Sequence, residues 1–140
     1  MNITFIIPCL NAENIILKNY KKLNNFTKKY KIKNKFIYIN DGSKDKTLEK
    51  LKKIKSKNVR ILNNKENLGK SYSIIRALKL INTGNVVLID CDLPYFKYLK
   101  KIIDHLNKYD LIIVNRKLKK SLNTEKSLNF YKIIRNFISN

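Results

Sequence analysis

Short apolar runs alternate with longer segments of helical periodicity, and this alternation restricts the fold more than any other feature of the sequence. Five runs have the length and composition of buried strands: 3–8, 36–39, 59–62, 86–89 and 111–114. Strands that alternate with helices form βαβ units and a mainly parallel sheet. We therefore predict an α/β fold, a Rossmann-like three-layer sandwich.

The segments between the runs carry apolar residues every three or four positions, as one face of a helix does. The four faces are Ile16, Tyr20, Leu23, Phe26 and Tyr30; then Leu48, Leu51 and Ile54; then Ile74, Ile75, Leu78 and Ile81; and last Leu99, Ile102, Ile103 and Leu106. Asp45 is a candidate N-cap for the second helix, and Pro94 lies near the predicted start of the fourth. A polar loop over 117–126 and an amphipathic helix over 130–137 are predicted to follow.

The chain is strongly basic, with 31 Lys and Arg against 10 Asp and Glu and a formal net charge of +21. Lysine is spread over nearly every segment and is enriched together with Asn and Ile, so codon bias explains the charge better than a nucleic-acid patch does. Nucleic-acid binding stays open as a less favoured alternative. A surface this basic favours anionic partners such as phosphorylated lipid or an acidic membrane.

The location and the cysteine chemistry are predicted from absent signals. No apolar run reaches the roughly 18 residues of a membrane span, and 1–10 lacks the basic start and cleavage site of a signal peptide. We therefore expect a cytoplasmic protein with reduced thiols at Cys9 and Cys91, two small residues near the site. His105 has no partner nucleophile and is interpreted as structural.

Polar residues follow the predicted strands, at the edge where parallel sheets bind ligands. Asp90 and Asp92 come after the fourth strand, and on an extended segment both carboxylates project to the same side. Two hard oxygen donors suit Mg²⁺ or Mn²⁺, although capping of the next helix is an equal alternative. Asp41 follows the second strand, where it either accepts hydrogen bonds from a nucleobase or serves a turn and cap.

A phosphate-binding segment is predicted between the third strand and the third helix. Its sequence, Asn67-Leu68-Gly69-Lys70-Ser71, offers backbone amides and the Lys70 ammonium to a phosphate. It is not a P-loop, because Asn64 stands where that motif requires glycine.

Taken in order, these motifs resemble glycosyltransferase family 2, whose donor-binding half has the GT-A fold. The matching segments are 3–11, ending in Pro8-Cys9-Leu10-Asn11; 39–47, around Asp41-Gly42-Ser43; 67–70; Asp90-Cys91-Asp92; and 110–116, ending in Asn115-Arg116. The Asp-x-Asp-Leu-Pro form is most similar to dolichyl-phosphate mannosyl- and glucosyltransferases. Asn40, Ser71 and Asn115 depart from the family pattern.

The resemblance implies an inverting transferase that uses a UDP- or GDP-linked sugar, with polyprenyl phosphate or a glycan as acceptor. It implies that Pro8 and Asn11 shape the base pocket, Asp41 contacts uracil or guanine, and Lys70 lies near the diphosphate. Asp90 would contact ribose or metal-bound water, Asp92 would ligate the metal, and Arg116 would belong to the donor site.

The resemblance also sets the expected domain organisation. Residues 1–116 would form the nucleotide-sugar-binding domain, and 117–140 would lead toward a missing acceptor half that supplies any general base. The chain would then be a fragment, a split gene or a decayed copy. Alternatively, it is a donor-binding module that needs a separate acceptor subunit or a membrane anchor, peripheral at the inner face of the membrane.

Overall fold

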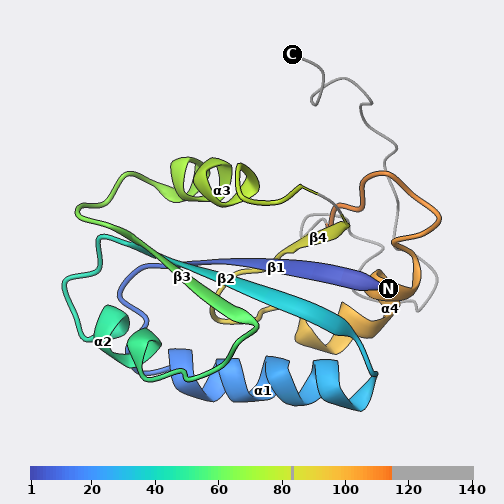
Figure 1. Ribbon diagram of the computed structural model, residues 1–140, viewed down its shortest axis with the longest axis horizontal. Coiled ribbons are helices and arrows are strands. Elements are labelled where there is room, and N and C mark those ends of the chain that lie inside the picture. Colours follow the sequence, from blue (N-terminus) through green and yellow to red (C-terminus); the bar gives the residue numbers. More distant parts are fainter. Residues whose placement is uncertain (83, 115–140) are drawn as a thin grey trace, which may run out of the picture. The chain divides into compact units, whose positions relative to one another are not determined.

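The computed structural model describes residues 1–82 and 84–114, which belong to two compact units, Met1–Pro94 and Tyr95–Asn140. The first unit contains β1 (Asn2–Cys9), α1 (Ile16–Lys29), β2 (Lys33–Asp41), α2 (Thr47–Lys52), β3 (Val59–Asn64), α3 (Lys70–Leu78) and β4 (Asn85–Leu88) (Figure 1). The described part of the second unit contains the 3-10 helix η1 (Phe96–Tyr98) and α4 (Leu99–Asp104).

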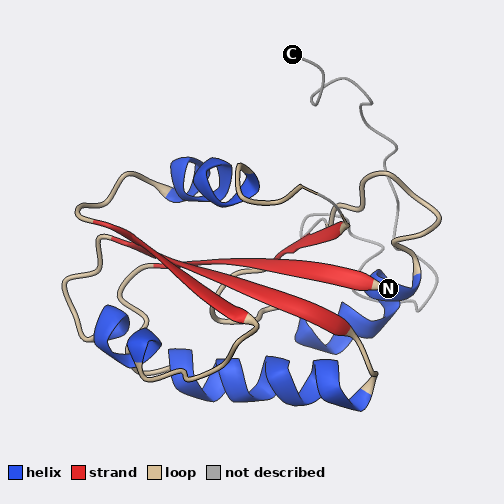
Figure 2. Cartoon of the chain, viewed as in Figure 1, coloured by secondary structure: helices blue, strands red, loops and turns tan. Residues whose placement is uncertain are grey.

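The sheet is parallel throughout, with the strand order β3-β2-β1-β4 (Figure 2). In the centre, Ile6 of β1 lies opposite Ile37 of β2 on one side and Leu88 of β4 on the other. Because all four strands run the same way, their carboxyl ends lie along one edge. The predicted α/β fold with a parallel sheet is confirmed.

Helices cover both faces of this sheet, which gives the predicted three layers (Figure 1). Between α3 and the sheet lies an aliphatic cluster of Ile6, Ile37, Ile39 and Leu62, which Ala77 of α3 completes. On the α1 side the core is aromatic: Tyr20 of α1 packs edge-on against Phe36 and Tyr38, with ring centroids 6.1 and 6.4 Å away. Side chains therefore alternate between two cores along each strand, as the period of a strand requires.

The predicted inner face of α3 is wrong in part. Ile75 and Leu78 are 55% and 44% exposed, whereas Ser73 and Ala77 are the buried residues of the helix. The reason is a hydrogen bond from Asn64 Nδ2 to Ser73 Oγ (2.9 Å), which turns the side of the helix that carries small residues toward the sheet. Apolar periodicity could not register a polar contact of this kind.

Two other expectations also differ from the structure. Residues 111–114 form no strand, although they are apolar, and Leu111 and Ile113 are exposed. An apolar run becomes a strand only where a neighbouring strand offers ladder hydrogen bonds, and none pairs with it in the described part of the chain. The fourth helix begins at Leu99, after η1, rather than near Pro94, and it buries Leu99 and Ile103 but not Ile102.

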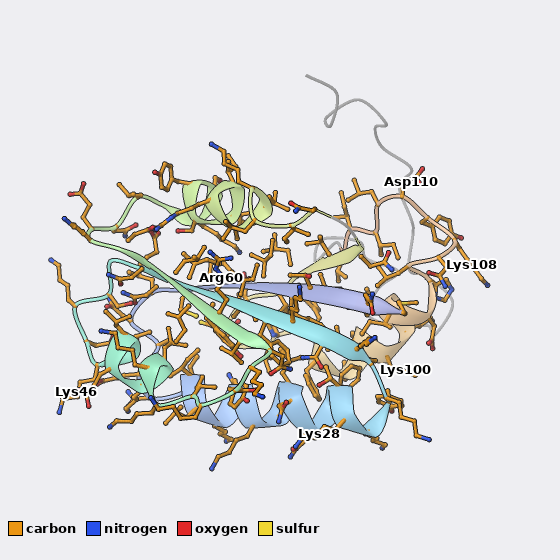
Figure 3. All side chains as sticks on the ribbon, viewed as in Figure 1. Lys28, Lys46, Arg60, Lys100, Lys108 and Asp110 are labelled. Atoms are coloured by element: carbon orange, nitrogen blue, oxygen red, sulfur yellow. The ribbon has the colours of Figure 1, made fainter. Side chains whose placement is uncertain are left out.

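The predicted polar loop over 117–126, the helix over 130–137 and Arg116 lie outside the described residues. Within 1–82 and 84–114, no helix is long and apolar enough to cross a bilayer. Basic side chains occur on separate elements: Lys28 on α1, Lys46 just before α2 and Arg60 on β3 (Figure 3). This dispersal agrees with compositional bias and does not favour the nucleic-acid alternative.

Candidate functional site

The loops after β1 and β2 are joined by hydrogen bonds at the carboxyl edge of the sheet. The Asn11 N–H donates to Ser43 Oγ (3.0 Å), and the Lys44 N–H donates to Asn11 Oδ1 (3.0 Å). Asn11 has a positive φ of 48°, a conformation that Asn tolerates better than most residues do. The side chain predicted to shape a base pocket thus holds two loops together.

A second set of contacts continues this connection through Glu13, which sequence reasoning missed. The Glu13 N–H donates to Asp45 Oδ2 (3.0 Å), and the Lys46 N–H donates to Glu13 Oε2 (3.0 Å). Asp45 Oδ1 also accepts from the Thr47 N–H (2.9 Å), so Asp45 supports the start of α2, although the N-cap position belongs to Lys46. Burial acts to raise the pKa of Asp45, but hydrogen bonds from Thr47 and Glu13 outweigh it and hold that pKa below its usual range.

Gly42 marks the place where a third loop, 65–69, lies against the second. It has a φ of +67°, and a Cβ atom at this position would stand 2.1 Å from the carbonyl carbon of Glu66. A real Cβ cannot approach that closely. Glycine is therefore required here for close packing of two backbones as well as for its conformation.

Asp41, at the end of β2, is the buried anchor of this third loop and is only 4% exposed. Its Oδ1 accepts from Asn64 Nδ2 (2.7 Å) and from the Leu68 N–H (3.1 Å). Burial acts to raise the pKa of this carboxyl, but these hydrogen bonds, with others from Ser73 and Gly69, lower it overall. Asp41 therefore positions the backbone directly before Lys70, a role that neither sequence-based alternative included.

Lys70 and Asp90 lie together, as a shared ligand site requires. Lys70 is the first residue of α3, after the N-cap Gly69, and its Nζ forms an ion pair with Asp90 Oδ1, just beyond β4. Both side chains remain partly exposed, at 55% and 33%. The residue predicted to meet phosphate and one of the two predicted metal ligands are thus direct neighbours.

The Asp90–Asp92 segment is a turn, which corrects the extended geometry inferred from sequence. The Leu93 N–H donates to the Asp90 carbonyl (3.0 Å), and Leu93 has a positive φ of 55°. The i, i+2 rule for strands therefore does not place the two carboxylates on one side. The capping alternative also fails as stated, because η1 has Tyr95 at its N-cap and no side-chain cap hydrogen bond.

The family model described as glycosyl transferase family 2 matches residues 4–139. The chain belongs to this family. It is 27% identical over 143 residues to an uncharacterised glycosyltransferase of Synechocystis sp., sll0501, covering 96% of this chain and 44% of that protein.

Two solved structures share the fold. One is residues 1–349 of TarS from S. aureus, with a TM-score of 0.61 and 23% identity over 79% of this chain and 33% of that chain. The other is the mannosyltransferase PcManGT from Pyrobaculum calidifontis, in complex with GDP-Man and Mn²⁺, with a TM-score of 0.62 and 20% identity over 74% of this chain and 32% of that chain. The chain thus spans less than half the length of each of these three proteins.

Members of glycosyl transferase family 2 that use a divalent cation need hard oxygen ligands, and the described residues offer few. No group of three or more His, Cys, Asp or Glu side chains that could hold a metal occurs in 1–82 and 84–114. Two carboxylates on one turn, Asp90 and Asp92, still fit Mg²⁺ or Mn²⁺, because such ions commonly take one or two carboxylates and complete their coordination with water and substrate phosphates.

The support of this turn comes from α1, a contribution that sequence reasoning also missed. Asn19 Nδ2 donates to the Cys91 carbonyl oxygen (2.8 Å) across 72 positions of sequence. The only available signal was a polar residue beside the apolar stripe of the helix. Asn19 thereby holds the backbone between Asp90 and Asp92.

Cys9 and Cys91 lie beside the site, as expected, and the Cys9 Sγ–H donates to the Ile7 carbonyl oxygen (3.4 Å). Cys9 is buried and Cys91 is half-buried. Interaction with the Cys91 side chain, together with burial, raises the pKa of Cys9, and the same interaction lowers the pKa of Cys91. The pairing itself was not predicted from sequence.

Proposed function

We propose that this chain supplies the nucleotide-sugar-binding part of an inverting glycosyltransferase that uses a UDP- or GDP-linked sugar. The observation that carries the proposal is the pairing of Lys70 with Asp90 at the carboxyl edge of the sheet, with Asp92 in the same turn. A cation and two carboxylates at this edge suit a diphosphate and its metal ion. Membership of glycosyl transferase family 2 supports the same reaction class.

The proposed roles follow from chemistry. Lys70 offers its ammonium to the diphosphate, and Asp90 and Asp92 hold Mg²⁺ or Mn²⁺. When bound, the metal would neutralise charge on the departing nucleoside diphosphate. Asp41 orients the backbone before Lys70 and is proposed to contact the base. A neighbour in fold, PcManGT, was solved with GDP-Man and Mn²⁺, which supports this donor class.

Pro8, Asn11 and Arg116 complete the proposed donor site. Pro8 is half-buried on β1, opposite Ile39 of β2. Asn11 holds the loops that would border a base, whereas the place of Arg116 rests on the family resemblance alone. We retain 1–116 as the proposed donor-binding domain.

The proposed acceptor is polyprenyl phosphate or a glycan, and the residues that bind it, with any general base, are proposed to lie outside the described residues. Exposed lysines such as Lys28 and Lys46 would favour contact with an anionic membrane (Figure 3). A peripheral position at the inner face of the membrane is part of this proposal.

Calorimetry with the 140-residue chain tests donor binding. UDP and GDP are titrated with Mn²⁺ and with EDTA, into the wild type, Asp92→Asn and a control, Asp104→Asn, which removes an exposed acid paired with Lys100 on α4. We expect Mn²⁺ to strengthen binding in the wild type and the control but not in Asp92→Asn. Equal affinity in Mn²⁺ and EDTA would contradict the metal role, and no binding of either nucleotide would contradict the donor site.

A further inference from the structure

The register of the sheet brings Cys9 and Cys91 next to each other. β1 and β4 pair in parallel as far as Ile6 opposite Leu88, where the Ile89 N–H donates to the Ile6 carbonyl (3.1 Å). Cys9, the last residue of β1, and Cys91, in the turn after β4, each stand three residues beyond this pair. Where the two strands pair they are about 4.8 Å apart, within the Cα separation of about 4.4–6.8 Å that a disulfide needs, and the two cysteines follow this pair at equal distance along the chain.

The two thiols differ in access. Cys9 is 1% exposed at the end of β1, whereas Cys91 is half-buried in the turn between Asp90 and Asp92. Interaction between the two side chains raises the pKa of Cys9 and lowers that of Cys91, which agrees with their closeness in the sheet. Neither thiol has a role in the proposed sugar transfer. An accessible thiol and a buried one therefore lie beside the proposed metal ligands with no function assigned by that reaction.

We propose that Cys9 and Cys91 form a redox modification site that closes to a reversible disulfide. Hydrogen peroxide oxidises the accessible Cys91 thiol to a sulfenic acid and is reduced to water. The Cys9 sulfur then attacks the Cys91 sulfur, the S–S bond forms, and the sulfenic oxygen leaves with the Cys9 proton as a second water. A small dithiol restores both thiols by exchange and is itself oxidised to a disulfide.

Closure of this disulfide displaces the Asp90–Asp92 turn. An S–S bond of about 2.05 Å is much shorter than the contact between two free sulfur atoms. Cys9 is held in the sheet, so Cys91 moves and carries Asp90 and Asp92 with it. We expect metal-dependent nucleotide binding to weaken about tenfold, as when the support of metal ligands is lost. This effect rests on the proposed function, whereas disulfide formation does not.

The experiment treats the 140-residue chain with hydrogen peroxide and then with dithiothreitol. Mass spectrometry should find a monomer lighter by two hydrogen atoms, with the peptides of Cys9 and Cys91 linked, and dithiothreitol should reverse the change. Amide hydrogen exchange at 90–93 should slow in the oxidised protein. Titration of GDP or UDP with Mn²⁺ into both forms measures the effect on the donor site.

Two single substitutions serve as controls. Cys91→Ser should leave Cys9 reduced, because the remaining thiol is buried. Cys9→Ala should leave a sulfenic acid on Cys91 that dimedone traps. Disulfides between chains, or overoxidised Cys91 beside a free Cys9 thiol in the wild type, would overturn the redox site. An internal disulfide that leaves both exchange at 90–93 and nucleotide affinity unchanged would overturn the displacement of the turn, even if the donor site itself is real.

Discussion

Lys70 and Asp90 neutralise each other across the carboxyl edge of the sheet, although they stand 20 positions apart in the sequence. In the proposed donor complex, the Lys70 ammonium would bind a diphosphate and the Asp90 carboxylate would bind a metal ion. Binding of the two ligands would therefore replace the existing ion pair. Because both side chains are partly exposed, the pair itself contributes no more than about 1 kcal/mol to stability. Its value would then lie in holding both groups in place.

Lys70→Ala should weaken UDP or GDP binding about tenfold or more while leaving the melting temperature nearly unchanged. The ammonium would lose a charge-assisted contact worth about 1.5–3 kcal/mol, whereas the exposed ion pair adds little to folding. Calorimetry and thermal unfolding measure the two effects. Lys53→Ala is the matched control, because it removes another exposed lysine that takes part in an ion pair. Lys53 is the C-cap residue of α2, and its ammonium pairs with Glu49 of the same helix. Similar nucleotide affinity in the two variants would refute a phosphate role for Lys70.

Asp41→Asn should destabilise the folded chain by about 1–3 kcal/mol at pH 7, because it places an amide N–H₂ or a weaker acceptor against the Asn64 and Leu68 donors. This effect differs from both sequence-based alternatives, in which Asp41 either contacts a nucleobase or serves a turn and cap. Urea unfolding measures the change. A variant as stable as the wild type would return Asp41 to a role in ligand binding alone.

Acid should remove the contribution of Asp41 to stability. Its folded pKa is lowered from an unfolded value of about 3.9, so near pH 4 the unfolded chain binds more protons and the free energy of unfolding falls as the pH falls. The contribution is present above about pH 5 and is lost as the pH drops through the folded pKa. Urea unfolding from pH 6 to 2.5 should therefore show a shallower pH dependence for Asp41→Asn. Parallel curves would mean that the carboxylate is not the group being titrated.

Gly42→Ala should destabilise the chain more than Gly69→Ala. Both glycines have positive φ, so each substitution costs about 1–3 kcal/mol of backbone strain. Only at Gly42 does the new Cβ also meet the Glu66 backbone, whereas nothing lies within 4 Å at Gly69. Thermal unfolding of the two variants separates the clash from the strain. Equal losses would show that the loops can move apart at no cost.

Asn19→Ala should weaken Mn²⁺-dependent nucleotide binding about tenfold, in the range seen when support of metal ligands is removed. Its amide holds the Cys91 carbonyl between Asp90 and Asp92. Asn25→Ala, at an exposed position of the same helix, is the control for helix propensity. Equal nucleotide affinity of Asn19→Ala and Asn25→Ala would show that the Asp90–Asp92 turn keeps its shape without the Asn19 hydrogen bond.

The sequence by itself determined the order of strands and helices in 1–94, because burial on one or both faces leaves a local periodic trace. It also placed the polar residues Asp41, Lys70 and Asp90 after strands or before a helix, and the direction of parallel strands then sends them to one edge. These inferences needed no knowledge of which strands are neighbours.

Only the tertiary structure decided what depends on neighbours far apart in sequence. The pairing of β4 with β1 puts Cys91 beside Cys9, and the packing of α3 brings Lys70 to Asp90. Asn64, through its bond to Ser73, selects the inner face of α3 against the apolar pattern. Each is a polar or pairwise contact between separate segments, and such contacts leave no periodic signal in either segment alone.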